Sequence, residues 1–131
     1  MSETPETWYE FRNAIYAGEF DAASNMLNEQ PALLHLTNGI GETVLHFLAV
    51  ENDLEGVGWL HARGADLNTK NEFGTPVIFE VASLGYKELL DWFLAKGADL
   101  RAEDADGQDI VLHLLELDHE DMAEWVRSRG A

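Results

Sequence analysis

The sequence contains no cysteine, and only 8 lysines and arginines accompany its 25 aspartates and glutamates. Without cysteine the chain forms neither a disulfide bond nor a thiolate metal site, which fits a reducing compartment. The formal charge of −17 repels the phosphates of nucleic acids and of anionic membranes. We therefore expect no nucleic acid and no membrane as a partner, whereas a basic protein surface would complement the charge.

Long apolar runs are missing as well. The first residues, MSETPETWYEF, contain no basic region followed by an apolar stretch, which argues against a secretory signal. No segment is apolar over the length needed to span a bilayer, and we expect a cytoplasmic protein. Because 46% of the 131 residues are apolar, the chain can still form a single domain with a buried core.

Catalytic signatures are also absent, since the chain has no G-x-S-x-G, no P-loop and no G-x-G-x-x-G. The histidines form no H-x-x-x-H pair and have no cysteine beside them, which disfavours a metal site. Most carboxylates are interpreted as solvated helix surface. We expect no enzymatic activity, no cofactor and no metal. The minor alternative is an enzyme or a metal protein that uses the histidines, which are His35, His46, His61, His113 and His119.

What the chain does contain is a repeat of 33 residues. The period recurs in tryptophan, in glycine and in apolar positions, as in Trp59, Trp92 and Trp125, Gly64, Gly97 and Gly130, and Leu45, Ile78 and Val111. Several columns that share one period indicate a stacked repeat, because each unit buries its apolar face against the next. We interpret the three periodic tryptophans as side chains of the shared core.

Each unit is predicted as helix, loop, helix and hairpin. In the second unit Thr43 is expected to cap a helix with the sequence VLHFLAV, whose apolar residues follow helical spacing. A second helix runs to about Ala62, and Gly64 supplies the left-handed residue that ends it. The segment ADLNTKNEFG is too polar and turn-rich for a helix. Asp109 replaces the capping threonine in the last unit.

This pattern resembles the ankyrin repeat, with its consensus D-x-x-G-x-T-P-L-H-x-A-A, G-H-x-E and L-L-L-x-x-G-A-D-V-N. The matches are NGIGETVLHFLAVENDLEGVGWLHARGADLN at 38–68, NEFGTPVIFEVASLGYKELLDWFLAKGADL at 71–100 and, more weakly, DADGQDIVLHLLELDHEDMAEWVRSRGA at 104–131. The resemblance implies an all-α solenoid of stacked helix-loop-helix units joined by short β-hairpin-like turns. The single domain would cover 1–131, with units at about 7–37, 38–70, 71–103 and 104–131. His46 matches a family residue that hydrogen-bonds the loops between units.

The resemblance also implies a non-enzymatic protein–protein interaction module. Partners of ankyrin proteins dock on the concave side, which is built from turn tips and the exposed face of each first helix. The matching residues here are Ile40, Glu42, Val50, Glu51, Glu72, Phe73, Thr75, Leu84, Asp106, Gln108, Glu116 and Leu117. The apolar members lie among acids and no bases, which favours an interface for a basic partner. A half-buried contact between adjacent turns is the alternative.

A second functional hypothesis is an immunity or inhibitor protein that neutralises a basic toxin or nuclease, because the chain is small and highly acidic. The oligomeric state stays open between a monomer, which we favour, and a dimer. The charged last helix, HEDMAEWVRSRG, would cap a monomer. The first unit is expected to be more apolar outside and would be the surface that pairs two chains, through Trp8, Tyr9, Phe11 and Tyr16.

Overall fold

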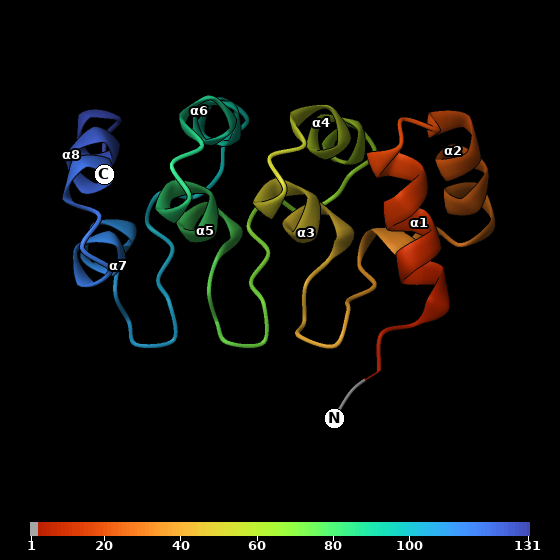
Figure 1. The fold of residues 1–131 in the computed structure, drawn as a ribbon, viewed down its shortest axis with the longest axis horizontal. Coiled ribbons are helices and arrows are strands. Elements are labelled where there is room, and N and C mark those ends of the chain that lie inside the picture. The colour runs from red at the N-terminus through yellow and green to blue at the C-terminus, as the bar shows by residue number, and fades with distance from the viewer. Residues whose placement is uncertain (1–2) are drawn as a thin grey trace.

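The structure is a computed structural model that describes residues 3–131 and is all-α, as the sequence predicts (Figure 1). The helices are α1 (Glu6–Tyr16), α2 (Phe20–Glu29), the 3-10 helix η1 (Pro31–Leu34), α3 (Val44–Val50), α4 (Leu54–Ala62), α5 (Val77–Ser83), α6 (Lys87–Ala95), α7 (Ile110–Glu116) and α8 (Glu120–Ser128). No helix in this part of the chain is both long and apolar enough to cross a membrane. Within residues 3–131 the only β-type pairing consists of two isolated bridges, between Thr37 and Thr43 and between Lys70 and Pro76.

The helices form two rows, and hairpin-like turns project from one edge of the stack (Figure 1). The α3, α5 and α7 helices follow one another in the first row, and each pairs with the next helix along the chain. Their starts are determined locally. The Oγ1 of Thr43 accepts a hydrogen bond from the backbone N–H of His46 at 3.3 Å, and Asp109 accepts one from that of Leu112 at 2.9 Å. The α5 helix instead begins after Pro76, whose ring fixes φ near the helical value.

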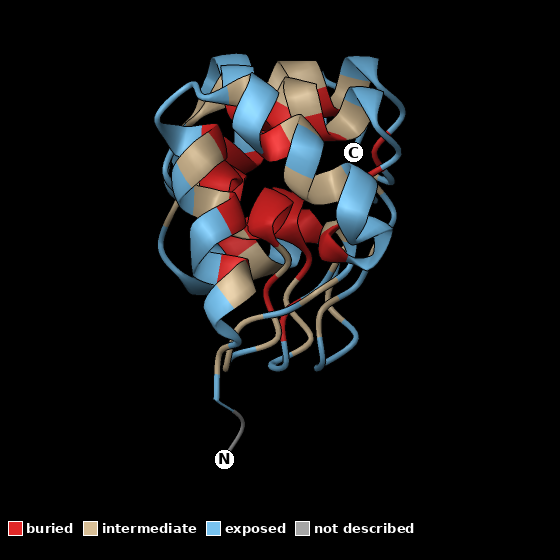
Figure 2. Ribbon diagram, turned by 90° about the vertical axis from the view of Figure 1, so that its right-hand side faces the viewer, coloured by how far each residue is buried: buried red, intermediate tan, exposed pale blue. Residues whose placement is uncertain are grey.

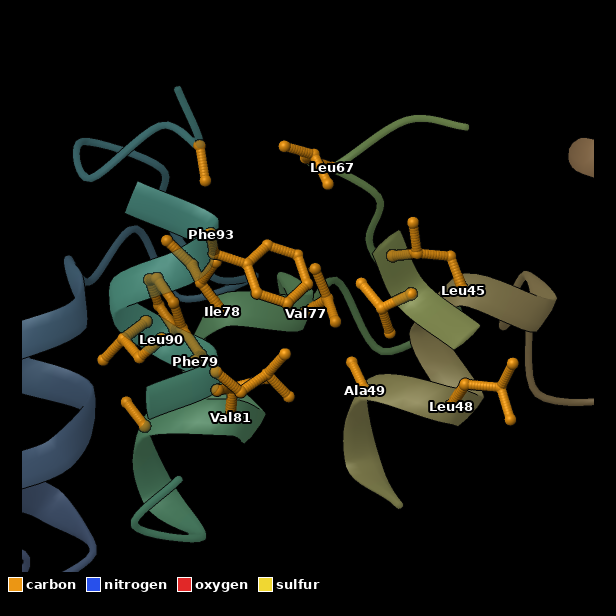
Figure 3. Close-up of a cluster of buried hydrophobic side chains, with 14 of the residues drawn as sticks. Leu45, Leu48, Ala49, Leu67, Val77, Ile78, Phe79, Val81, Leu90 and Phe93 are labelled. Atoms are coloured by element: carbon orange, nitrogen blue, oxygen red, sulfur yellow. The ribbon is translucent and has the colours of Figure 1, made fainter. Parts of the chain in front are cut away.

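The core lies between the two rows and runs through the whole stack as one cluster (Figure 2). Figure 3 shows the junction of two units, where Leu45 and Ala49 of α3 lie opposite Val77 and Val81 of α5. All of these side chains are buried. Burying one aliphatic side chain of this size contributes about 1.5–3 kcal/mol. Packing against the neighbouring units therefore adds to the packing within each helix pair.

The periodic tryptophans lie less deep than the sequence predicts. Trp59 and Trp125 are half-buried against the core, and each carries a guanidinium group on its ring, from Arg63 at 3.8 Å and Arg129 at 4.2 Å. The buried tryptophan is Trp8, whose Nε1–H donates to a backbone carbonyl at 3.1 Å. The periodic indoles lie on the outer row of second helices, where long cationic side chains can cover an aromatic ring.

The two ends of the stack also differ from the expectation. Trp8 and Phe11 are buried rather than outside, because α1 packs against α3, while Tyr9 and Tyr16 are exposed as predicted. Further exposed apolar side chains lie at the C-terminal end. Leu112 is 51% exposed there, although Phe79 is fully buried 33 residues earlier. The charged α8 therefore does not shield all of the last unit.

The hairpins share one turn geometry. The side-chain oxygen of Asn38, Asn71 or Asp104 accepts the backbone N–H groups two and four residues further on, at 2.9–3.1 Å. The hairpins of the second and third units are joined directly, because the N–H of Glu72 donates to the carbonyl of Ile40 at 2.9 Å. The packing is close: a Cβ atom on Gly41 would lie 2.6 Å from the Glu72 nitrogen. A Cβ atom on Gly74 would likewise lie 2.9 Å from the Cβ of Ala105, so the next pair of hairpins is also closely packed.

Candidate binding face

The hairpin tips and the outward side of the first-row helices together form the surface that we call the hairpin face. It carries four large apolar side chains that are 43% to 62% exposed, namely Ile40, Phe73, Leu84 and Leu117. Four exposed carboxylates of the same face come from the tips and the helix ends, namely Glu51, Glu72, Asp106 and Glu116. Protein–protein interfaces typically have exposed apolar side chains at their centre and charged side chains around them, and the hairpin face has this composition.

Six of the twelve expected residues line a single hollow of about 150 Å³ between the last two hairpins and α7. These six are Phe73, Thr75, Asp106, Gln108, Glu116 and Leu117. Glu51 lies in a second hollow, at the N-terminal end of the face. Val50, Thr75 and Gln108 are half-buried. This degree of burial is what we expect if these residues form contacts between adjacent turns and do not bind a partner. The sequence-based set is therefore divided between two hollows, the hairpin tips and the C-terminal ends of α3 and α5.

Glu42 does not belong to the accessible surface. The residue is 7% exposed, and its Oε1 accepts a hydrogen bond from Asn38 Nδ2 at 3.0 Å inside its own hairpin. Its backbone carbonyl accepts the indole N–H of Trp8. The first unit covers this side of the hairpin, a contact that no repeat period could reveal.

A further column of residues on the face was not expected. Phe47, Glu80 and His113 are spaced by 33 residues and lie one helical turn before the C-terminal ends of α3, α5 and α7. The signal was present in the sequence, because residues three or four apart share one face of a helix. Phe47 lines the N-terminal hollow and His113 the C-terminal one.

The N-terminal hollow also corrects the expectation that the face has no bases. It is lined by Arg12, Asn13, Tyr16, Phe47 and Glu51. The guanidinium of Arg12 lies 5.1 Å from the ring centre of Phe47, and its Nη2 donates to Asn13 Oδ1 at 2.7 Å. Among the described residues that line the two hollows, Arg12 is the one arginine or lysine. The C-terminal hollow is thus the strongly negative part of the face.

Asp104 forms the floor of that hollow. Its Oδ2 lies 2.9 Å from His113 Nδ1, and the aspartate side chain is only 8% exposed. Burial raises the pKa of Asp104. The hydrogen bonds from His113 and from the backbone N–H groups of Gln108 and Asp106 together lower this pKa by more than burial raises it, so the net shift is downward. The group is therefore a carboxylate at neutral pH.

A second polar cluster, Glu42, His46 and Glu80, has ligand atoms within 4.8 Å of one another and resembles a metal site in composition. The Nε2 of His46 lies 2.8 Å from Glu80 Oε2 and 3.7 Å from Glu42 Oε2. However, the Nδ1 of His46 is buried without a partner, whereas a metal-bound histidine normally donates its second N–H. The geometry favours an Nε2–H that donates to Glu80, whose other oxygen accepts from Asn71 at 3.2 Å. His46 therefore links α3 to the next unit.

Part of the positive charge is placed away from the two hollows. Arg63, Lys96 and Arg129 are the residues that end α4, α6 and α8 in the second row, and they too are spaced by 33. Cations are favoured there because the C-terminal end of a helix carries partial negative charge. Within residues 3–131, Glu72, Asp106 and Glu116 form no salt bridge.

The family model for ankyrin repeats (many copies) matches residues 45–94, which lie in the segment from α3 to α6. A comparison with curated proteins gave no match. The α7–α8 pair continues the same geometry beyond the matched segment, with the same turn and the same spacing between its helices. Ankyrin repeats are general protein–protein interaction modules, and the fold is a non-enzymatic one. From the matched segment and the helix pairs stacked on both sides of it, we conclude that the chain has an ankyrin repeat fold.

Proposed function

We propose that the chain is a non-enzymatic module that binds a partner protein with a basic surface through the hairpin face. The observation that carries this proposal is the exposure of Ile40, Phe73, Leu84 and Leu117 on one face of a rigid stack. Since about half of each side chain is in water, covering one of them would contribute roughly 1 kcal/mol. Neither the helices nor the turns require large apolar groups at these positions.

The sign of the charge supports a basic partner. Glu51, Glu72, Asp106 and Glu116 surround the apolar positions, and the whole chain carries −17. Complementary potentials accelerate encounter and disfavour partners of like charge. The proposed contact set is the sequence-based one without the buried Glu42.

The test uses the purified chain as bait on extracts of its native cells, with three matched variants. Phe73→Ala removes an apolar contact and Glu72→Lys reverses a charge on the face. Glu29→Lys makes the same reversal at the exposed end of α2, in the other row. Calorimetry then measures the affinity of each variant for the captured and purified partner. Phe73→Ala and Glu72→Lys should each lower this affinity about tenfold or more, because substitutions near the centre of an interface have effects of this size.

The Glu29→Lys protein should bind the partner as the wild type does, and all three variants should melt within a few degrees of it. Equal affinity of the wild type and all three variants would refute the assignment of this face. Binding should also weaken as salt is raised, because exposed charges are screened.

An immunity or inhibitor protein that neutralises a basic toxin or nuclease is the second candidate. The observation in its favour is the charge of −17 in a chain of 131 residues. Under this proposal the captured partner is an enzyme, and one equivalent of the chain abolishes its activity. A partner whose activity is unchanged in the complex would leave the general binding module as the function.

We further propose that residues 1–131 act as one cytoplasmic domain and as a monomer. The continuous core supports a single domain. The burial of Trp8 and Phe11 leaves Tyr9 and Tyr16 of the dimer surface expected on the first unit, while Leu112 and Leu115 are exposed at the other end of the stack. Sedimentation of the wild type, of Tyr16→Lys and of Leu112→Lys tests the alternative, since a dimer would be dissociated by the substitution at its own interface.

A further inference from the structure

The C-terminal hollow of the hairpin face combines apolar walls with a negative rim. Phe73 and Leu117 are both exposed and line it from opposite elements, the hairpin of one unit and the end of α7 in the next. Asp106 and Glu116 lie in the same lining with their side chains exposed. With a volume of about 150 Å³, the hollow is suited to one side chain rather than to a small-molecule ligand.

The chain itself shows which side chain fits such surroundings. Arg129 lies 4.2 Å from the ring centre of Trp125 while its Nε donates to Asp91 Oδ1 at 2.9 Å. An aromatic face and a carboxylate thus hold one guanidinium group together. Arg12 lies over Phe47 in the other hollow of the same face. The lining of the C-terminal hollow offers the aromatic ring and the carboxylates but contains no lysine or arginine among the described residues.

On the basis of the proposed function, we infer that this hollow binds an arginine side chain of the partner. The methylene stem packs against Leu117, and the guanidinium group stacks on the ring of Phe73 while it bonds to the carboxylates of Asp106 and Glu116. Arginine is favoured over lysine because its planar head stacks on an aromatic ring and can bond two carboxylate oxygens at once. The floor remains negative as well, because the Asp104 carboxylate is held by His113.

The first experiment needs no partner. The ¹⁵N-labelled chain is titrated with acetyl-arginine methylamide, with the lysine analogue, and with the citrulline analogue, which has nearly the same shape but no charge. Amide shifts should concentrate at residues 73, 104–108 and 113–117, with arginine binding more tightly than lysine and citrulline producing almost no shift. Scattered shifts, or equal shifts with citrulline, would overturn the inference.

Variants then locate the contact. The pair Asp106→Asn and Glu116→Gln keeps the size of both exposed side chains and should weaken binding of the arginine amide by about fivefold to tenfold, since an exposed ion pair contributes up to about a factor of five. The pair Asp21→Asn and Glu29→Gln, both exposed on α2 in the other row, is the matched control that removes the same charge and should leave the binding unchanged. Equal loss with the control would show that only net charge matters and would refute the site.

The captured partner separates this inference from the function on which it rests. If partner binding depends on Phe73 and Glu72 but not on Asp106 and Glu116, the arginine site is wrong while the binding face stands. If no variant of the face affects the partner, the proposed function itself fails. The partner's arginines are then replaced by lysine one at a time. One such replacement should lower the affinity of the complex by as much as the Asp106 and Glu116 double variant does.

Discussion

The close packing of neighbouring hairpins predicts that two glycines with the same backbone conformation differ in their tolerance of alanine. Gly41 and Gly107 both have positive φ, +79° and +75°. Alanine in this left-handed region costs about 1–2 kcal/mol at either position. At Gly107 the added Cβ meets no atom within 4 Å, so this backbone strain is the whole effect.

At Gly41 a second cost is added. The Cβ would lie 2.6 Å from the backbone nitrogen of Glu72, whose N–H donates to Ile40 at 2.9 Å. The two hairpins must separate to relieve this contact, and the loss of that hydrogen bond costs about another 1 kcal/mol. We expect a total loss of about 2–3 kcal/mol for Gly41→Ala, compared with about 1–2 kcal/mol for Gly107→Ala.

Urea unfolding followed by far-ultraviolet circular dichroism measures both losses. For a chain of 131 residues 1 kcal/mol corresponds to roughly 4 °C in the melting temperature, so the extra loss at Gly41 is also measurable by heating. The amide signals of Glu72 and Phe73 should move in Gly41→Ala and stay in place in Gly107→Ala. Equal destabilisation by the two substitutions would refute the idea that the hairpins are locked together.

Two further substitutions follow from the buried polar contacts. Asp104→Asn keeps the turn, as Asn38 and Asn71 do in their hairpins, but removes the charge paired with His113. Because the folded pKa of Asp104 is lowered, its contribution is complete above the unfolded value of about 3.9 and is lost as the pH falls below it; the stability difference from wild type should be present at pH 7 and shrink in urea titrations near pH 3. Trp8→Phe removes one of the two hydrogen bonds to the Glu42 carbonyl, which still accepts from the backbone N–H of Asn38, and should cost about 0.5–1.5 kcal/mol, measured in urea, whereas Trp125→Phe should cost less.

The period, the helix caps and the turns could be predicted from the sequence because they depend on neighbouring residues. Thr43 and Asp109 cap their helices as expected, and Gly64 has the positive φ assigned to it. The burial of Glu42 under α1, by contrast, depends on a residue 34 positions away. The indole of Trp59 is only half-buried because the side chain of Arg63, and not a further apolar group, covers its ring. A repeat period shows which residues are equivalent but not how deeply they are buried.

The same limit explains the candidate site. Phe73, Asp106 and Leu117 were predicted on one face because the repeat fixes the order of turn tips and helix ends. Their meeting in one hollow was not predictable, because it requires the distance between two neighbouring units. Arg12 was missed for a related reason: it lies in the divergent first unit, which the period does not reach, and only packing places it beside Phe47.

The link of each helix pair to its immediate neighbours has a mechanical consequence. A row of units joined in this way can loosen at one junction while the remaining junctions stay intact. A partner that contacts two or three turn tips would hold the neighbouring units together and disfavour their separation. Its binding would then slow hydrogen exchange in second-row helices that it never touches, and the free chain would fray from its ends inward.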